Sequence, residues 1–141
     1  SILSNVSNVY LQKELSPILY QNNNYTFSFN NALNNTMKQS AISSTLFTIS
    51  ESSSQMYIED DGYGIVNLYT TSNNQKTLYK AQIGTVNYTT GDVQLNALTI
   101  TGFSGDYLKI KGLPVITDIK AKNNTILRLK TENIAITSKS E

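Results

Sequence analysis

The chain has 141 residues, 15% of them charged, with a formal net charge of +1 and with neither cysteine nor histidine. That length suffices for one domain with its own core, and the missing residue types remove disulfides, thiol chemistry, and the commonest general base and metal ligand. Serine, threonine and asparagine make up 49 of the 141 residues, which favours a turn-rich β protein over a charged nucleic-acid binder, and no apolar run approaches the roughly 18 residues of a membrane span.

Residues 1–40 are the weakly defined part of the sequence. Residues 9–16 carry apolar side chains at near-helical spacing, and Pro17 ends any helix there, so strand and helix stay equally open. Aromatic residues alternate with polar ones over residues 25–29, which predicts a strand. A polar link separates that strand from residues 18–20, and the two runs are a candidate hairpin.

The middle of the chain becomes steadily more regular. Residues 30–39 are polar and suit one helical turn or an ordered loop, whereas residues 42–49 suit a strand with a bulge at Leu46-Phe47. Strand-length runs joined by turns of two to five residues then predict an antiparallel meander, because short turns exclude parallel crossovers. These runs are residues 56–58, 64–69, 76–83 and the two halves of a hairpin over residues 83–100.

The hairpin over residues 83–100 is the strongest architectural signal. Gly91 supplies the positive φ angle that a tight reversal needs. A three-residue loop would pair Tyr88 with Asp92, whereas matching of apolar residues would pair Tyr88 with Val93, and both registers stay open. The three-residue loop would place apolar groups on both faces of the hairpin.

Further strands are predicted after the hairpin. Adjacent apolar residues at Ala97-Leu98 indicate a phase slip within its second strand. Residues 107–111 form an alternating strand that Gly112 and Pro114 close. Additional runs follow at residues 115–121, 125–130 and 134–137.

Together these patterns predict a mainly β fold. We expect an antiparallel β-sandwich or meander with short hairpins and little helix, forming a single domain over residues 1–141 with its core meander at 56–137. Because the chain starts at Ser1 rather than at a methionine, we expect it to be a piece of a longer protein.

Acidic residues are the only candidates for catalysis or for metal binding. The run Glu59-Asp60-Asp61-Gly62 lacks the alternating spacing and distant Glu of a calcium loop, so a solvated turn is predicted. A carboxylate pair for glycoside hydrolysis would have to come from the four residues Asp60, Asp61, Asp92 and Asp106, three of which adjoin glycine in predicted turns. The sequence therefore predicts no enzyme, no metal site and no cofactor. It predicts structural roles in turns for Asp61, Gly62, Gly64, Gly91, Gly112 and Pro114.

Basic residues gather toward the C-terminus. They occur two apart in the pairs Lys109 and Lys111, Lys120 and Lys122, and Arg128 and Lys130, so each pair shares one face of a strand. Aromatic residues do not alternate with these basic residues as stacking for single-stranded nucleic acid requires. A charged face in water or against an acidic partner is the prediction, with no nucleic-acid partner.

Nine tyrosines give a weak interface signal, since tyrosine combines a large contact area with few rotors and a polar tip. The alternative is that about half of them close the core with hydroxyls at its rim. The candidate interface residues are Tyr63, Tyr69, Tyr79, Tyr88 and Tyr107.

Several motifs together resemble a known family. They are Asp60-Asp61-Gly62-Tyr63-Gly64, Gly84-Thr85-Val86-Asn87-Tyr88-Thr89-Thr90-Gly91, Pro114 followed by Asp118-Ile119, and Asn124-Thr125-Ile126-Leu127. In this order they resemble the C-terminal region of the baseplate wedge proteins of contractile-tailed bacteriophages. The resemblance covers residues 57–136.

This resemblance implies a structural role in the virion, in a tail baseplate assembled in the cytoplasm of the bacterial host. It implies a homodimer that also contacts other wedge subunits through tyrosines and sheet edges, with no catalytic residues. The alternative is a carbohydrate-binding or adhesin-type β-sandwich module, because polar β surfaces often host such sites. Neither hypothesis involves a membrane.

Overall fold

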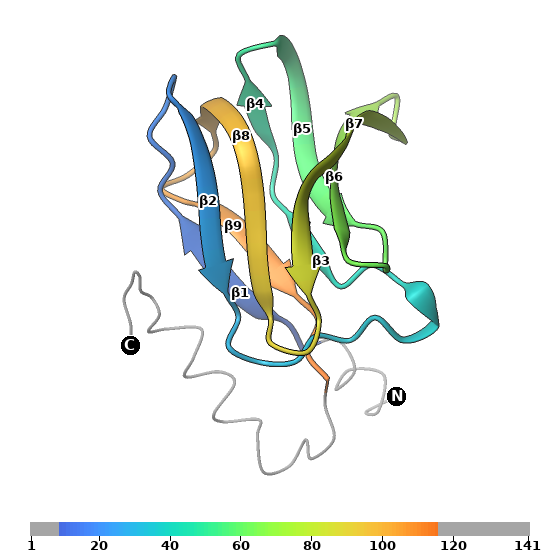
Figure 1. Cartoon of the computed structure of the whole chain (residues 1–141). Helices are drawn as coiled ribbons and strands as arrows, with labels where there is room; N and C mark the ends of the chain where they lie inside the picture. Colours follow the sequence, from blue (N-terminus) through green and yellow to red (C-terminus); the bar gives the residue numbers. More distant parts are fainter. Residues whose placement is uncertain (1–8, 116–141) are drawn as a thin grey trace.

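Residues 9–115 are described by a computed structural model, in which strands and loops account for all but one 3-10 turn (Figure 1). The strands are β1 (Leu11–Leu15), β2 (Asn22–Ser28), β3 (Ile42–Ser44), β4 (Phe47–Ile49), β5 (Ser52–Asp60), β6 (Ile65–Ser72), β7 (Gln75–Asn87), β8 (Asp92–Phe103) and β9 (Leu108–Gly112). The 3-10 turn is η1 (Thr36–Lys38). The predicted β class is therefore confirmed for this part of the chain.

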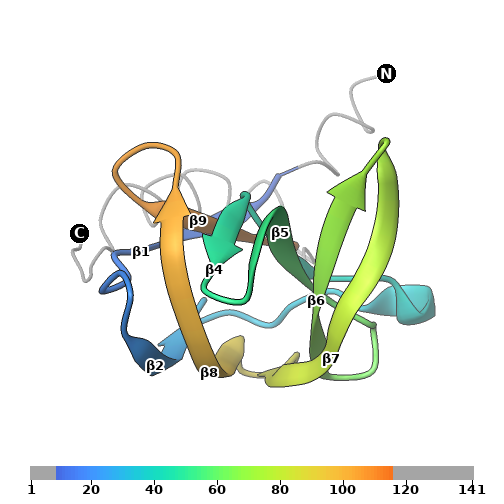
Figure 2. The ribbon, with the colours of Figure 1, turned by 90° about the horizontal axis from the view of Figure 1, so that it is seen from above.

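Five antiparallel strands close into a barrel. Strands β5, β6, β7 and β8 follow one another as the predicted meander, and β8 then pairs with β4, which also pairs with β5 (Figure 2). The meander prediction is confirmed, but the predicted sandwich is wrong. Pairing between β4 and β8 joins the two ends of the sheet instead of leaving two stacked layers.

Bulges in the long strands explain how so few strands can close. Strands β7 and β8 have 13 and 12 residues, and each contains a non-glycine residue with positive φ, Gln82 at 60° and Ala97 at 55°. A bulge bends a strand and increases its twist. The bend lets β8 pair with β7 over residues 92–95 and with β4 over residues 100–103.

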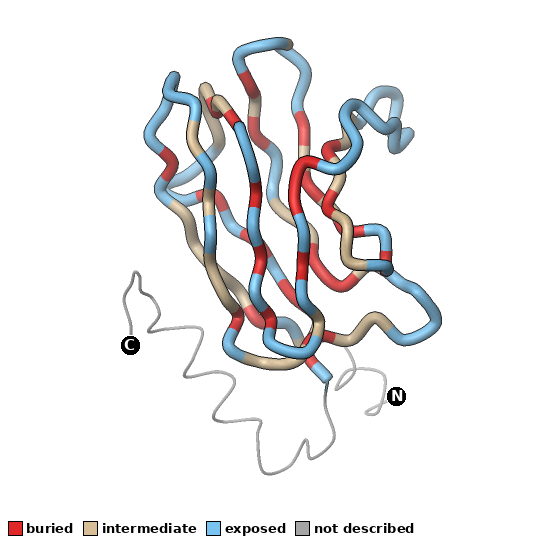
Figure 3. The backbone as a smooth tube through the Cα atoms, in the orientation of Figure 1, coloured by how far each residue is buried: buried red, intermediate tan, exposed pale blue. Residues whose placement is uncertain are grey.

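The predicted phase slip in β8 is confirmed at Ala97. Leu95 and Leu98 are both buried although they are three residues apart, while Asn96 and Ala97 between them are exposed (Figure 3). An ideal strand would place two residues three apart on opposite faces. Because of the extra residue, the apolar side chains of Leu98 and Ile100 in the second half of β8 are again buried.

Strands outside the barrel extend its wall. Strand β2 pairs with β8, and β9 and β1 follow β3 in the sheet. Strands β3 and β4 form one bent strand that is interrupted at Thr45-Leu46. Before the interruption β3 pairs with β9, and after it β4 pairs with β8. The predicted bulge thus lies one residue earlier than expected. The predicted hairpin between residues 18–20 and 25–29 is wrong, because β2 pairs with β8.

One apolar cluster fills the space enclosed by the strands. Its least exposed members are Phe47, Leu33, Ile42, Met56, Ile58, Leu68, Leu95, Ile100, Leu108, Ile110, Val66 and Val93. In β9, buried Leu108 and Ile110 alternate with exposed Lys109 and Lys111, as predicted. The other two basic pairs and the strands predicted after residue 115 lie outside the described residues.

The β7–β8 hairpin adopts a third register that neither prediction included. Val86 lies opposite Val93, Asn87 lies opposite Asp92, and residues 88–91 form a four-residue turn. Both valines are buried, so the apolar groups share the inner face rather than occupying both faces. Tyr88 leaves the ladder because its hydroxyl bonds elsewhere, as described below.

Candidate interaction surfaces

The β5–β6 turn is built as the sequence predicts. The Asp61 carboxylate accepts hydrogen bonds from the backbone N–H groups of Tyr63 (2.7 Å) and Ile65 (3.1 Å). Gly62 has a φ of +83°, and a Cβ there would lie 2.2 Å from the carbonyl oxygen of Lys38. Gly64 also has positive φ, +93°. The turn therefore depends on glycine at both positions and packs tightly against η1.

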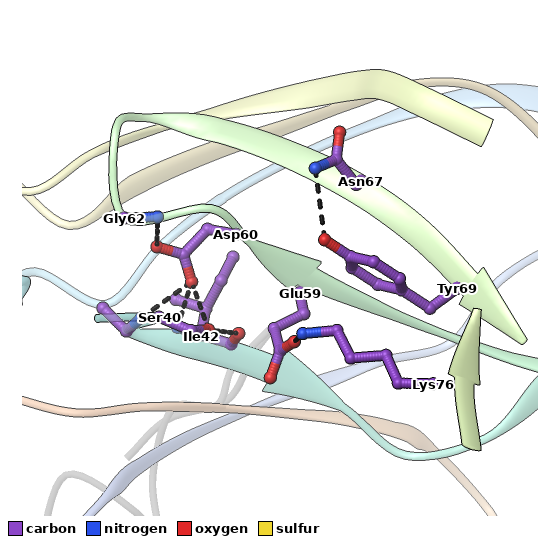
Figure 4. A network of polar contacts seen from close by, with 9 residues as sticks. Ser40, Ile42, Glu59, Asp60, Gly62, Asn67, Tyr69 and Lys76 are labelled. Carbon is purple, nitrogen blue, oxygen red and sulfur yellow. Dashed lines mark hydrogen bonds and ion pairs between the residues drawn. The ribbon is translucent and has the colours of Figure 1, made fainter. Parts of the chain in front are cut away.

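Asp60 is the residue that sequence reasoning placed wrongly. It is only 2% exposed rather than solvated. One carboxylate oxygen accepts hydrogen bonds from Ser40 Oγ (2.8 Å) and from the N–H groups of Ala41 (2.7 Å) and Ile42 (2.8 Å), and the other accepts from Gly62 N–H (3.3 Å) (Figure 4). Asp60 therefore fastens the segment before β3 to the β5–β6 turn.

Tyr88 completes this network from the β7–β8 turn. Its hydroxyl donates to the second Asp60 oxygen (2.6 Å) and accepts from Gly64 N–H (2.9 Å). Burial, followed by the hydrogen bond to Asp60, raises the pKa of the Tyr88 hydroxyl well above its usual value. This predicted interface tyrosine therefore uses its polar group inside the protein.

The remaining candidate tyrosines lie on several different elements. Tyr63, at the β5–β6 turn, is 69% exposed, and Tyr107, before β9, is 42% exposed. On the barrel wall, Tyr69 of β6 stacks on Tyr57 of β5 with ring centroids 5.7 Å apart. Tyr79 lies in the outer part of β7 and is 39% exposed. The five tyrosines are thus spread over several elements, although Tyr63 and Tyr88 line one groove and Tyr69 and Tyr79 lie on neighbouring strands.

The outer part of β7 is the most exposed regular structure among the described residues. All eight residues from 75 to 82 are exposed. They pair with β6 on one side, whereas β7 pairs with β8 only over residues 84–87. Within the described part of the chain, the other edge of residues 75–82 is therefore open. Leu78 on this strand is 54% exposed.

Sequence reasoning missed Leu78 as an interface candidate, although a signal was present. Leu78 and Tyr79 are adjacent in a predicted strand, and adjacent strand residues point to opposite faces. Since only one face of a barrel strand meets the core, one of the two side chains must be exposed. Here the whole segment lies beyond the core, and both are exposed.

Charged contacts hold the outer part of β7 to its neighbours. Lys76 pairs with Glu59 of β5, and its ammonium lies 4.4 Å from the ring centroid of Tyr69 (Figure 4). Further along the strand, Glu51 accepts hydrogen bonds from Lys80 Nζ and from the Tyr79 hydroxyl, both at 3.1 Å. These two bonds lower the pKa of the Glu51 carboxyl. The exposed strand is thus held by charged contacts to Glu59 of β5 and to Glu51 in the β4–β5 turn.

The acidic candidates for chemistry do not gather into a metal site. Among residues 9–115, no group of three or more carboxylate, histidine or cysteine residues is placed to hold a metal ion. Asp60 and Asp61 make the structural bonds described above, Asp92 begins β8, and Asp106 lies in the turn before β9. No helix in this part of the chain is long and apolar enough to span a membrane.

Comparison with known proteins adds no relative. No protein-family model matches the chain. No curated protein matches it. No solved structure matches it.

Proposed function

We propose that this protein is a structural assembly module of a phage tail baseplate wedge. In this proposal it dimerises, contacts other wedge subunits, and belongs to the virion after assembly in the bacterial cytoplasm. The order of motifs over residues 57–136 supports the family. The observation that carries the assembly role is the open edge of β7.

An open strand edge favours association for a physical reason. Residues 75–82 expose one row of backbone N–H and C=O groups that a strand from another chain can pair with. The same segment exposes Leu78, and burial of its 54% exposed side chain against a partner would stabilise association by about 1–1.5 kcal/mol. Two lysines would ordinarily protect such an edge, but Lys76 and Lys80 are each paired with a glutamate.

The solution mass of the chain tests this proposal. Sedimentation velocity over a concentration series should show a monomer–dimer equilibrium for the unmodified protein. Leu78→Asp should weaken dimerisation at least about tenfold, because it would place a charge in the buried contact. Ile18→Asp is the matched control, since Ile18 is similarly exposed (59%) but precedes β2.

Two results would count against the proposal. One is a chain that stays monomeric throughout the series and also fails to bind co-expressed wedge subunits. The other is a dimer that Ile18→Asp weakens as strongly as Leu78→Asp does, since that would separate the association from β7.

A further inference from the structure

The outward face of β2, β8 and β7 carries two rows of uncharged polar side chains and one carboxylate. Thr26 lies beside Gln94, which lies beside Thr85. In the next row Ser28 lies beside Asp92, which lies beside Asn87. We call these six residues the polar face; they line an open groove of about 920 Å³.

The groove has an aromatic rim. Tyr63 of the β5–β6 turn also lines it and is 69% exposed, so its ring is available to a ligand. The Lys38 ammonium lies 5.2 Å from the centroid of that ring. The N–H of Tyr63 is bonded to Asp61 and the neighbouring Gly64 N–H to Tyr88. The rim is therefore attached to the Asp60 network rather than to a free loop.

The groove already contains ordered hydrogen-bonding groups. Hydrogen bonds from the Ser28 and Thr90 hydroxyls lower the pKa of the Asp92 carboxyl, so Asp92 is an anionic acceptor at neutral pH. Gln94 donates its side-chain N–H to Asn96 (2.8 Å), which fixes the amide and leaves its carbonyl oxygen as an acceptor. Thr26 and Thr85 add hydroxyl groups that can donate and accept. Asn87 adds N–H donors, because its side-chain oxygen already accepts from the N–H groups of Thr89 and Thr90.

The chemistry of the lining restricts the ligand. Among the described residues that line the groove, none is lysine or arginine, which disfavours phosphate, nucleic acid and acidic glycans. Of the apolar lining residues, Val86 and Val93 are only 6% and 1% exposed and Phe27 is half-buried, so a lipid or apolar peptide would find only a small apolar surface to contact. A pairing strand would need a free edge, but β8 is paired on both sides here.

We propose that the groove on the polar face binds a neutral saccharide. Such a ligand offers many hydroxyl groups that both donate and accept, which complements the six side chains. Asp92 and Gln94 would accept from sugar hydroxyls, Asn87 would donate to ring or hydroxyl oxygens, and the Tyr63 ring would cover an apolar sugar face. This site is separate from the β7 edge and does not depend on assembly.

Titration of the ¹⁵N-labelled full chain followed by NMR tests the proposal. The probes are maltotetraose, chitotetraose and β-1,4-galactotetraose, with a heparin tetrasaccharide as the anionic comparison. At least one neutral probe should cause saturable shifts at residues of the polar face. Gln94→Ala should weaken that binding about three- to tenfold, and Tyr63→Ala should weaken it comparably.

Matched controls lie outside the groove. Gln75→Ala removes an exposed amide and Tyr107→Ala an exposed ring, and neither should change the binding constant. The proposal is overturned if no neutral probe binds saturably, if only the heparin fragment binds, or if the four variants are equivalent. Shifts on the polar face that depend on protein concentration instead of saccharide would also overturn it, since that face would then join copies of the chain.

Discussion

Asp60 is the most constrained single residue in the described part of the chain. Its carboxylate is buried and accepts from Ser40, Ala41, Ile42, Gly62 and Tyr88. A buried carboxylate is tolerated when hydrogen bonds replace its lost hydration. The residues bonded to it come from three separate segments, so one side chain fixes their mutual positions.

Asp60→Asn should therefore destabilise the protein by about 2–4 kcal/mol, because the amide nitrogen replaces one acceptor oxygen and its N–H donors would face N–H or O–H groups. Urea denaturation gives the free energy of unfolding. Asp61→Asn is the control, because an asparagine can still accept the two bonds of the exposed turn. Equal losses in the two variants would contradict the role assigned to Asp60.

The pKa of Tyr88 makes a prediction about alkaline pH. Because folding raises the pKa of the Tyr88 hydroxyl above the ordinary tyrosine value of 10.0, the folded state holds the proton more tightly than the unfolded state. The stabilisation is therefore fully present below pH 10.0 and is lost as the pH rises above it. Tyr88→Phe should lower stability at neutral pH and flatten the decline above pH 10.0, as measured by urea denaturation at several pH values. If the free energy of unfolding of Tyr88→Phe declined with alkaline pH as steeply as that of the unmodified protein, the role assigned to the Tyr88 hydroxyl would be contradicted.

Sequence alone contained a hint of the buried position of Asp60. Met56, Ile58 and Asp60 are two apart, so a continuous strand places all three on one face, and all three are buried. The Asp-Gly pair at Asp61-Gly62 is a strong turn signal, however, and it led to the prediction that Asp60 belongs to a solvated turn. The partners of Asp60 could not be predicted, because Ser40 and Tyr88 are distant in sequence and contribute no local pattern.

Among the elements, the β7–β8 hairpin shows how far local rules reach. The sequence correctly predicts a reversal with Gly91 at positive φ, observed at +83°. It does not predict the four-residue turn, because Tyr88 is drawn out of the ladder by its bond to Asp60. Register therefore depends on a tertiary contact as well as on turn chemistry.

Substitution of Gly91 separates backbone strain from steric contact. Gly91→Ala should destabilise the protein by about 3 kcal/mol or more, since it combines an unfavourable φ with a Cβ only 2.4 Å from the Asn31 carbonyl oxygen. Gly105→Ala is the matched control: its φ is +80° but nothing lies within 4 Å. It should cost only about 1–2 kcal/mol. Equal falls in melting temperature would refute the steric part of this account.

At the scale of the whole molecule, barrel closure was the feature that sequence reasoning could not supply. Strands of a sandwich and of a barrel show the same alternation, and the difference lies in whether the ends of the sheet pair. Here that pairing joins Phe47 to Phe103 and Thr48 to Gly102, residues more than fifty positions apart. The sequence did mark the bulge at Ala97 that makes the pairing geometrically feasible.

Among the described residues, the outer part of β7 has one edge without a partner strand, as do β1, which pairs only with β9, and β2, which pairs only with β8. Strands β5, β6, β7 and β8 form backbone hydrogen bonds with their neighbours in the barrel, but residues 75–82 of β7 extend beyond the part that pairs with β8. The proposed assembly role therefore depends on one segment whose coverage can be measured directly.

Hydrogen–deuterium exchange followed by mass spectrometry, at protein concentrations below and above the midpoint of self-association, is the most direct test. We expect the amides of residues 75–82 that point to the open edge to exchange at least about tenfold more slowly in the associated state, because carbonyl groups of a partner strand then accept their hydrogen bonds. Amides of residues 18–20 should exchange at the same rate in both states. Association that leaves exchange in residues 75–82 unchanged while protecting another surface would contradict the proposed role of β7.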